Sequence, residues 1–132
     1  MSQENVDFVR RSAEAYERGD LSAVLETMSP DMVTYVAQPI PVAGTYHGPE
    51  GFLQLTIDWA ESFDDLEITP EEFIDPGDQV VTGVRHMSRG AESGVPVDTD
   101  IWYVWTIRGG ESARVDIFNE KSEALRTAGL EE

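Results

Sequence analysis

The chain has 132 residues, of which 40% are hydrophobic and none is cysteine. These values are typical of one globular domain spanning residues 1–132, and they exclude a disulfide framework and a thiolate metal site. With 26 acidic and 9 basic residues the formal net charge is −17, so the surface repels phosphate groups and no nucleic-acid partner is expected.

The first half of the chain is predicted to contain three helices and one strand. They are expected at residues 3–18, 21–28 and 48–63 for the helices and at residues 32–37 for the strand. Asp20 is a suitable N-cap for the second helix, because its short side chain accepts hydrogen bonds from free backbone N–H groups. Pro49 fits the first turn of the third helix, where its missing N–H costs nothing. The buried stripe of that helix is predicted to be Phe52, Leu55, Trp59 and Phe63.

The second half of the chain is predicted to be an antiparallel meander followed by a short helix. The strands are expected at residues 66–74, 79–89, 97–108 and 112–118, with tight turns at residues 75–78 and at Gly109-Gly110. Asn119 is the predicted N-cap of the last helix. Gly129 is expected to end it in a left-handed cap, with Leu130 packing back. Helices followed by a meander indicate an α+β fold.

Residues 101–107 form the most informative strand, because both of its faces carry apolar or aromatic side chains. Successive side chains of a strand point to opposite faces, so the segment divides into two sets. One set is Ile101, Tyr103, Trp105 and Ile107, and the other is Trp102 and Val104. An antiparallel strand with one wet face is polar on that face. We therefore expect one set to line a core or ligand cavity and the other to contact a partner subunit.

The ionisable residues do not suggest a metal or cofactor site. Seven acidic residues fall between positions 64 and 78, but their spacing does not match a calcium loop and is typical of a solvated strand edge and turn. His47 and His86 are far apart in the chain, whereas a zinc site needs at least three protein ligands. No metal and no cofactor is therefore expected.

Targeting and membrane signals are also missing from the sequence. No apolar run approaches the roughly 20 residues of a membrane-spanning helix. The first residues lack the basic and apolar regions of a signal peptide. We therefore expect a cytoplasmic protein with no membrane partner.

Several segments together resemble the SnoaL-like proteins of the nuclear-transport-factor-2-like superfamily. They are the break Gly19-Asp20 between two helices, the loop Pro39-Ile40-Pro41-Val42-Ala43-Gly44, the helix entry Gly48-Pro49-Glu50-Gly51, the hairpin Val104-Trp105-Thr106-Ile107-Arg108-Gly109-Gly110 and the tail from Glu123-Ala124-Leu125 to Gly129-Leu130. The resemblance implies a cone-shaped α+β fold, in which a strongly curved, mostly antiparallel sheet wraps around three N-terminal helices and a short C-terminal helix follows. It also implies a deep apolar cavity and a homodimer formed through the outer sheet face, with Trp102 and Val104 toward the partner.

The catalytic residues of the superfamily's enzymes are largely missing from this chain. The superfamily includes ketosteroid isomerases, polyketide cyclases, limonene-epoxide hydrolases and binding proteins, so the fold alone does not give the function. The oxyanion tyrosine, the base and the protonated aspartate of the isomerases fall on Ser12, Val36 and Tyr103. The tyrosine of the epoxide hydrolases falls on Tyr35, and their other polar positions fall on Ala37, Val84, His86 and Ile117. The missing carboxylates favour binding over catalysis.

His86 and Asp116 are the ionisable residues whose orientation matters most. If the strand face that His86 shares with Thr82 and Val84 points inward, burial favours the neutral imidazole, which serves as a base or polar anchor. The alternative is a histidine bonded to a neighbouring side chain or exposed at the rim. Asp116 alternates with the apolar residues of its strand, which places it on the outer face, paired with Arg108 or Arg85.

The predicted cavity wall consists of Tyr16, Tyr35, Trp59, His86, Tyr103, Trp105 and Ile117. The first hypothesis is a protein that binds a small hydrophobic molecule there without catalysis. The alternative is an enzyme on a small cyclic or polyketide-like substrate, of the cyclase, isomerase or epoxide-hydrolase type, using His86 with Tyr35 or Tyr103. A third alternative, a purely structural dimerisation module, leaves the cavity aromatics without a use.

Overall fold

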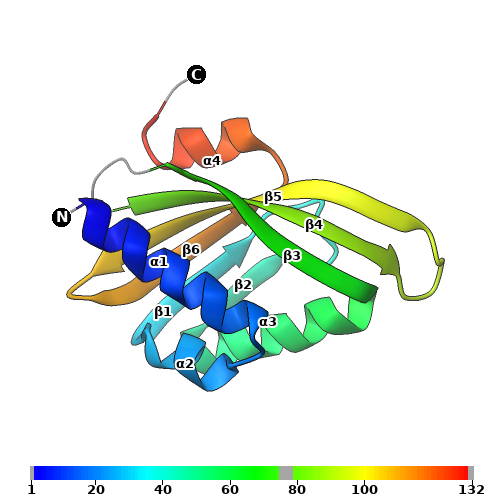
Figure 1. The fold of residues 1–132 in the computed structure, drawn as a ribbon, viewed down its shortest axis with the longest axis horizontal. Coiled ribbons are helices and arrows are strands. Elements are labelled where there is room, and N and C mark those ends of the chain that lie inside the picture. The colour runs from blue at the N-terminus through cyan, green and yellow to red at the C-terminus, as the bar shows by residue number, and fades with distance from the viewer. Residues whose placement is uncertain (1, 75–78, 131–132) are drawn as a thin grey trace.

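A curved, unclosed six-stranded sheet packs against three helices in the computed structural model, which describes residues 2–74 and 79–130 (Figure 1). The helices are α1 (Ser2–Glu17), α2 (Leu21–Glu26), α3 (Gly48–Ser62) and α4 (Lys121–Thr127). The strands are β1 (Met28–Val36), β2 (Gly44–His47), β3 (Phe63–Ile74), β4 (Gln79–Gly90), β5 (Pro96–Arg108) and β6 (Glu111–Phe118). This is the predicted α+β class.

The sheet runs in the order β2-β1-β6-β5-β4-β3. Its neighbouring strands are antiparallel except for the parallel pair β1 and β6. The main core lies between the sheet and helices α1, α2 and α3, which contribute Ala15, Val24 and Trp59 respectively. These side chains pack against buried strand residues such as Val36 and Val115. Removal of this apolar surface from water holds the helices on the concave face of the sheet.

Strand β1 is longer than the sequence predicts. It begins at Met28 rather than at residue 32, and α2 correspondingly ends at Glu26. Pro30 favours the end of a strand, yet β1 continues through it. The register between β1 and β6 shifts between Met28 and Val33, so Pro30 lies at an irregular part of the pairing. A proline is tolerated at such an irregularity because it does not need to donate a ladder hydrogen bond there.

Two further elements around α3 also differ from the prediction. The short strand β2 lies where no strand is predicted, between the strand at residues 32–37 and the third helix, and it pairs with β1. Phe63 was expected in the stripe of the third helix, but α3 ends at Ser62 and Phe63 is extended, paired with Gly90 of β4. The Phe63 ring still packs against the main core, so the helical pattern identified its burial and missed its backbone conformation.

One predicted cap and one predicted turn in this part of the chain are confirmed, and another predicted turn is untested. The backbone N–H of Ala23 donates to the Asp20 carboxylate at 3.2 Å, as expected for an N-cap. Gly109 and Gly110 both have positive φ, as a two-residue hairpin turn requires. Residues 75–78, where the other turn is predicted, lie outside the described residues.

Helix α4 ends as predicted and begins one residue later. Gly129 has φ of 80°, and the Leu130 N–H donates to the Leu125 carbonyl at 2.7 Å, which closes the helix in a left-handed cap. The N-cap is Glu120 rather than Asn119, and its side chain makes no capping hydrogen bond. Its extended backbone, with φ of −127° and ψ of 132°, sets the start of the helix.

The outer side of β5 is covered by the chain itself. Trp102 is 8% exposed and Val104 is fully buried, in a cluster that includes Ala124 of α4. The Lys121 ammonium lies 5.2 Å from the centre of the Trp102 ring. Trp102 and Val104 are therefore not available to a partner subunit as predicted, because α4 folds over this face. Formation of a homodimer stays a prediction.

Within residues 2–74 and 79–130, none of the helices combines the length and the apolar character needed to cross a membrane.

Candidate functional site

An apolar cavity of about 80 Å³ lies between helices α1 and α3 and the concave face of the sheet. The helices supply Val9, Ser12, Tyr16, Phe52, Leu55, Thr56 and Trp59 to its wall, among others. The strands supply Ile68, Thr82, Val84, Tyr103, Trp105 and Ile117. The cavity exists where it does because alternate residues of β4, β5 and β6 point to the concave face, beneath α1.

Most of the predicted wall residues do line this cavity. They are Tyr16, Trp59, Tyr103, Trp105 and Ile117. The rings of Tyr103 and Trp105 are stacked, with their centres 5.9 Å apart and their planes 7° from parallel. This stack is the inner aromatic set of the strand at residues 101–107, and it gives the cavity a flat wall.

Tyr35 is the clear error in the predicted wall. Its side chain lies on the outer face of β1, 37% exposed, with its ring edge against Phe118 at 6.4 Å between centres. Met32, Thr34 and Val36 are the residues of β1 that face inward, all of them at most 1% exposed. Because Tyr35 alternates with these residues, it cannot reach the cavity, and the likeness to the epoxide-hydrolase loop does not extend to its orientation.

His86 points inward but does not open onto the cavity. It is 2% exposed, and its Nε2 accepts a hydrogen bond from Trp59 Nε1 at 3.3 Å. Its ring also meets the rings of Phe63 and Trp59 edge-on, at 4.9 and 5.7 Å between centres. Accepting from the indole requires the neutral tautomer with its proton on Nδ1. Burial lowers the pKa of His86 and so favours the same neutral form.

The arrangement around His86 therefore serves to position Trp59. The hydrogen bond that His86 accepts comes from the Trp59 indole, whereas the enzymatic alternative uses His86 together with Tyr35 or Tyr103. Trp59 lies in the cavity wall, and His86 is absent from the residues that line it. Of the sequence alternatives, a histidine bonded to a neighbouring side chain is the one observed.

The two tyrosines of the wall remain neutral phenols. Burial raises the pKa of Tyr103, and the nearby Tyr16 raises it further. Burial also raises the pKa of Tyr16, although a hydrogen bond with Thr56 acts in the opposite direction. These hydroxyls can donate or accept hydrogen bonds at ordinary pH, but neither is a proton-accepting base in its phenolate form.

The predicted cavity wall did not include Ser12 and Thr82, two buried hydroxyl residues that line the cavity. They are 9% and 2% exposed, and their hydroxyl oxygens have no hydrogen-bond partner within the described part of the chain. The inward orientation of both residues follows from the helical and strand periodicity of the sequence. Ser12 lies three residues after Val9 on the inner side of α1, and Thr82 has the same strand parity as Val84. The helical pattern placed Ser12 beside the buried face of the first helix without assigning it to the cavity.

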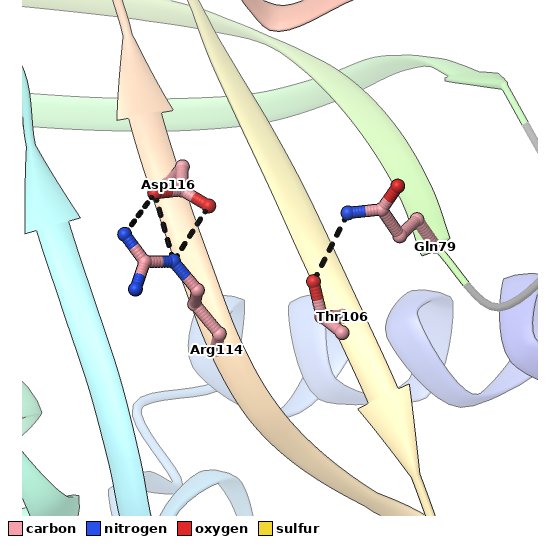
Figure 2. A network of polar contacts seen from close by, with 4 residues as sticks. All are labelled: Gln79, Thr106, Arg114 and Asp116. Carbon is pink, nitrogen blue, oxygen red and sulfur yellow. Dashed lines mark hydrogen bonds and ion pairs between the residues drawn. The ribbon is translucent and has the colours of Figure 1, made fainter. Parts of the chain in front are cut away.

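Asp116 lies on the outer face of the sheet, as predicted, with a different partner (Figure 2). Arg114, two residues earlier on the same strand face, donates three hydrogen bonds to its carboxylate at 2.9 to 3.1 Å. This bonding raises the pKa of the Arg114 guanidinium. Arg85, one of the two predicted partners, instead pairs with Asp98 at 2.8 Å. Residues two apart on a strand share a face, and β6 therefore supplies both members of the pair.

The outer pair lies in a second, polar hollow on the sheet. Gln79 Nε2 donates to Thr106 Oγ1 at 3.2 Å beside it, and both residues line this hollow with Arg114 and Asp116 (Figure 2). The Asp116 carboxylate, 5% exposed, is thus separated from the apolar cavity by the sheet itself. It cannot supply the carboxylate that the enzymatic alternative needs.

No group of three or more histidine and acidic residues is arranged to hold a metal ion among residues 2–74 and 79–130. His47 is exposed at the end of β2.

Residues 9–115 match the family model of the SnoaL-like domain. An uncharacterised protein of Mycobacterium tuberculosis is 27% identical over 115 residues, which are 86% of this chain and 87% of that protein.

Solved structures agree in fold. An NTF2-like protein of unknown function from Burkholderia pseudomallei superposes with a TM-score of 0.78 at 24% identity, covering 92% of this chain and 95% of that one. TerC, co-crystallised with polyporic acid, superposes with a TM-score of 0.77 at 20% identity, covering 95% and 98%. At these identities the likeness concerns the fold alone.

Proposed function

This chain belongs to the SnoaL-like domain family, and we propose that it binds a small, uncharged, hydrophobic molecule in the cavity beneath α1. The main observation that supports this proposal is the chemistry of the side chains that line the cavity. Apart from the exposed Glu17, the residues that line the cavity carry apolar, aromatic or hydroxyl side chains. Such a wall favours a ligand whose apolar surface leaves water on binding, and it offers no positive charge to an anion.

The cavity volume limits the size of this ligand. Pockets for drug-sized molecules span about 300–1,000 Å³, and an engineered apolar cavity of about 150 Å³ holds benzene. A volume of about 80 Å³ therefore suits a molecule no larger than a single small ring, unless α1 moves outward. Co-crystallisation of TerC with polyporic acid supports the use of this fold to hold organic molecules.

The enzymatic alternative finds no support in the geometry of the wall. A proton-transfer reaction needs a base within hydrogen-bond reach of the substrate. His86 is engaged with Trp59, and Asp116 lies on the opposite side of the sheet. Among the described residues that line the cavity, Glu17 is the one that carries a carboxylate, and its side chain is exposed to solvent. We therefore propose binding and not a reaction.

The test is a titration of the protein with methylenecyclopentane, a single apolar ring, followed by amide NMR and calorimetry. We expect saturable shifts of amides on α1, α3 and β5. Ala13→Leu places extra carbon atoms in the cavity from α1 and should abolish binding. Ala60→Leu makes the same change at an exposed position of α3 and serves as the matched control. Absence of binding to the wild type, or equal binding by Ala13→Leu, would contradict the proposal.

Native mass spectrometry of the freshly purified protein provides a complementary measurement. A co-purified molecule of one-ring size should appear as added mass that Ala13→Leu removes. The same spectrum measures whether the chain is a homodimer, as we propose from the family resemblance. Release of a molecule much larger than one ring would contradict the proposed ligand size.

A further inference from the structure

One residue of the cavity wall is held by a hydrogen bond to a histidine that lies behind the wall. Trp59 lines the cavity, and its indole N–H donates to His86 Nε2 at 3.3 Å. The rings of Trp59, Phe63 and His86 also contact one another, with their centres 4.9 to 6.3 Å apart. A change in the state of His86 therefore reaches the cavity wall through Trp59.

The hydrogen bond between Trp59 and His86 requires the neutral imidazole. In that form Nε2 accepts a hydrogen bond, whereas in the imidazolium both ring nitrogens carry protons and are donors. Protonation of His86 therefore removes the bond and places two N–H donors opposite each other. Burial lowers the pKa of His86, which agrees with surroundings that favour the neutral ring.

The elements packed against His86 are α3, through Trp59, and the neighbouring strands β3 and β5. Several of their acidic residues have other partners, since Asp58 accepts from Gln54 and Glu72 accepts from Lys121. Asp65 and Asp98 are likewise paired, with the arginines of β4, Arg89 and Arg85. The other charged residues described on these three elements are exposed: Glu50, Glu61, Asp64, Glu67, Glu71, Asp100 and Arg108.

The titratable groups that share the concave side with His86 are the phenols of Tyr16 and Tyr103. Burial raises the pKa of both, so they remain uncharged. An imidazolium at the observed position would thus be a buried charge without a counter-ion among the described residues. Such a charge is costly, so the protonated ring has to move toward water and away from Trp59.

We propose that protonation of His86 controls the affinity of the cavity for its ligand. The neutral ring holds Trp59 in the wall, and the imidazolium releases Trp59 and weakens binding. This inference rests on the proposed function and adds regulation by pH to it. His86 is a positioning residue here, because it contacts Trp59 and is absent from the residues that line the cavity.

The first measurement is the dissociation constant of methylenecyclopentane from pH 8 down to the lowest pH at which circular dichroism shows the folded chain. This probe has no ionisable group, so a pH dependence of its binding comes from the protein. The constant should be flat at high pH and rise by up to about tenfold per pH unit below the folded pKa of His86, as the binding-competent fraction falls. NMR signals of the His86 ring and the Trp59 indole N–H should titrate with the same midpoint.

Two substitutions of His86 separate the hydrogen bond from the mere presence of a side chain. Leucine cannot accept from the indole, so His86→Leu should bind the probe about 2- to 12-fold more weakly at pH 7, the value of one net hydrogen bond. The amide oxygen of glutamine can accept, so His86→Gln should bind more tightly than His86→Leu. The affinity of both variants should stay nearly constant between pH 7 and pH 5.

His47→Gln is the matched control, because it removes an exposed histidine that lies outside the cavity wall. Its pH profile of binding should be that of the wild type. A profile that loses its pH dependence in this variant would assign the effect to His47 and overturn the inference.

The remaining outcomes distinguish this inference from the proposed function. Binding that does not weaken on acidification, or that weakens equally in His86→Gln, would overturn the control by His86 and leave the binding function standing. Equal affinities of the wild type and His86→Leu at pH 7 would do the same. Loss of the fold before the His86 ring titrates would also overturn it, because no folded imidazolium form would exist. Absence of binding at every pH would overturn both proposals.

Discussion

On the concave face of the sheet, Tyr103 and Trp105 stand beside an open cavity, whereas on the convex face Trp102 lies tightly across β4. A Cβ atom added to Gly83 would lie 2.6 Å from Cη2 and Cζ3 of the Trp102 ring. The two faces belong to the same strands, and their aromatic residues alternate along one segment. The concave side leaves space beside Tyr103 and Trp105, whereas the convex side leaves none between Gly83 and Trp102.

This difference indicates which face tolerates change. A cavity wall accepts added carbon because the new atoms enter empty space, while a close-packed contact must shift to make room. Single substitutions on the strands can therefore test whether the concave face tolerates added atoms while the convex face is close-packed.

The largest effect is expected from Trp102→Ala. Loss of this ring removes the apolar surface that packs against α4 and should lower the free energy of unfolding by about 3–5 kcal/mol. Gly83→Ala should cost about 1–3 kcal/mol in the wild type by overpacking. In the Trp102→Ala background the same change should cost little, because the ring it meets is gone. Urea denaturation of the four proteins measures the cycle, and strictly additive losses would contradict the close contact.

A smaller loss is expected from Arg114→Met on the convex face. The Asp116 carboxylate is 5% exposed and would lose all three of the hydrogen bonds that Arg114 donates. The expected cost is about 1–3 kcal/mol, below that of a fully buried pair because half of the Arg114 side chain is exposed. Arg85→Met breaks a pair in which both side chains are about half exposed and should change urea stability little. Equal losses of unfolding free energy in the two variants would show that the burial of Asp116 does not strengthen its pair with Arg114.

The pH dependence of stability should depend on His86 behind the concave wall. Burial lowers its pKa in the folded chain, while in the unfolded chain the pKa is about 6.5. The unfolded chain therefore binds a proton that the folded chain does not, and stability falls as the pH drops below about 6.5 toward the lowered folded pKa. The fall between pH 7 and pH 5 should be smaller in His86→Gln than in the wild type. Urea denaturation at both pH values tests this, and identical falls would refute it.

The smallest effect is expected from Val84→Ile, one residue from Gly83 and on the opposite face. Val84 lines the cavity, so one added methyl group enters open space. The melting temperature should change little, corresponding to less than about 1 kcal/mol in either direction. Gly83→Ala adds a methyl group to the other face and is the matched comparison. A loss in Val84→Ile as large as that in Gly83→Ala would mean that the concave face is also close-packed.

The sequence predicted much of the fold and part of the site, for reasons visible in single residues. Asp20 and Gly129 act through local backbone geometry, so their roles as caps could be predicted without knowledge of the fold. The alternation of side chains along the strand correctly placed Tyr103 and Trp102 on opposite faces of the sheet. Tyr35 was misplaced because the likeness of its loop was followed in preference to the alternation of Thr34 and Val36, and a polar threonine does not look like a core residue.

Some features needed contacts between segments far apart in the chain. The bond from Trp59 to His86 joins α3 to β4, and the cover over Trp102 comes from α4 at the other end of the chain. No local pattern records either contact. The same is true of the unpaired hydroxyls of Ser12 and Thr82, because a missing partner is a property of the assembled surroundings.

By itself, the sequence determined the α+β class, the two-faced aromatic strand and the lack of carboxylates at the positions that related enzymes use. These follow from periodicity, turn chemistry and residue identity, which act over a few neighbouring residues. Only the tertiary structure decided that Trp102 is covered by α4, that His86 is bonded to Trp59 and that two hydroxyls border one small cavity. Packing brings distant side chains together, and the volume left between them depends on how all the elements meet.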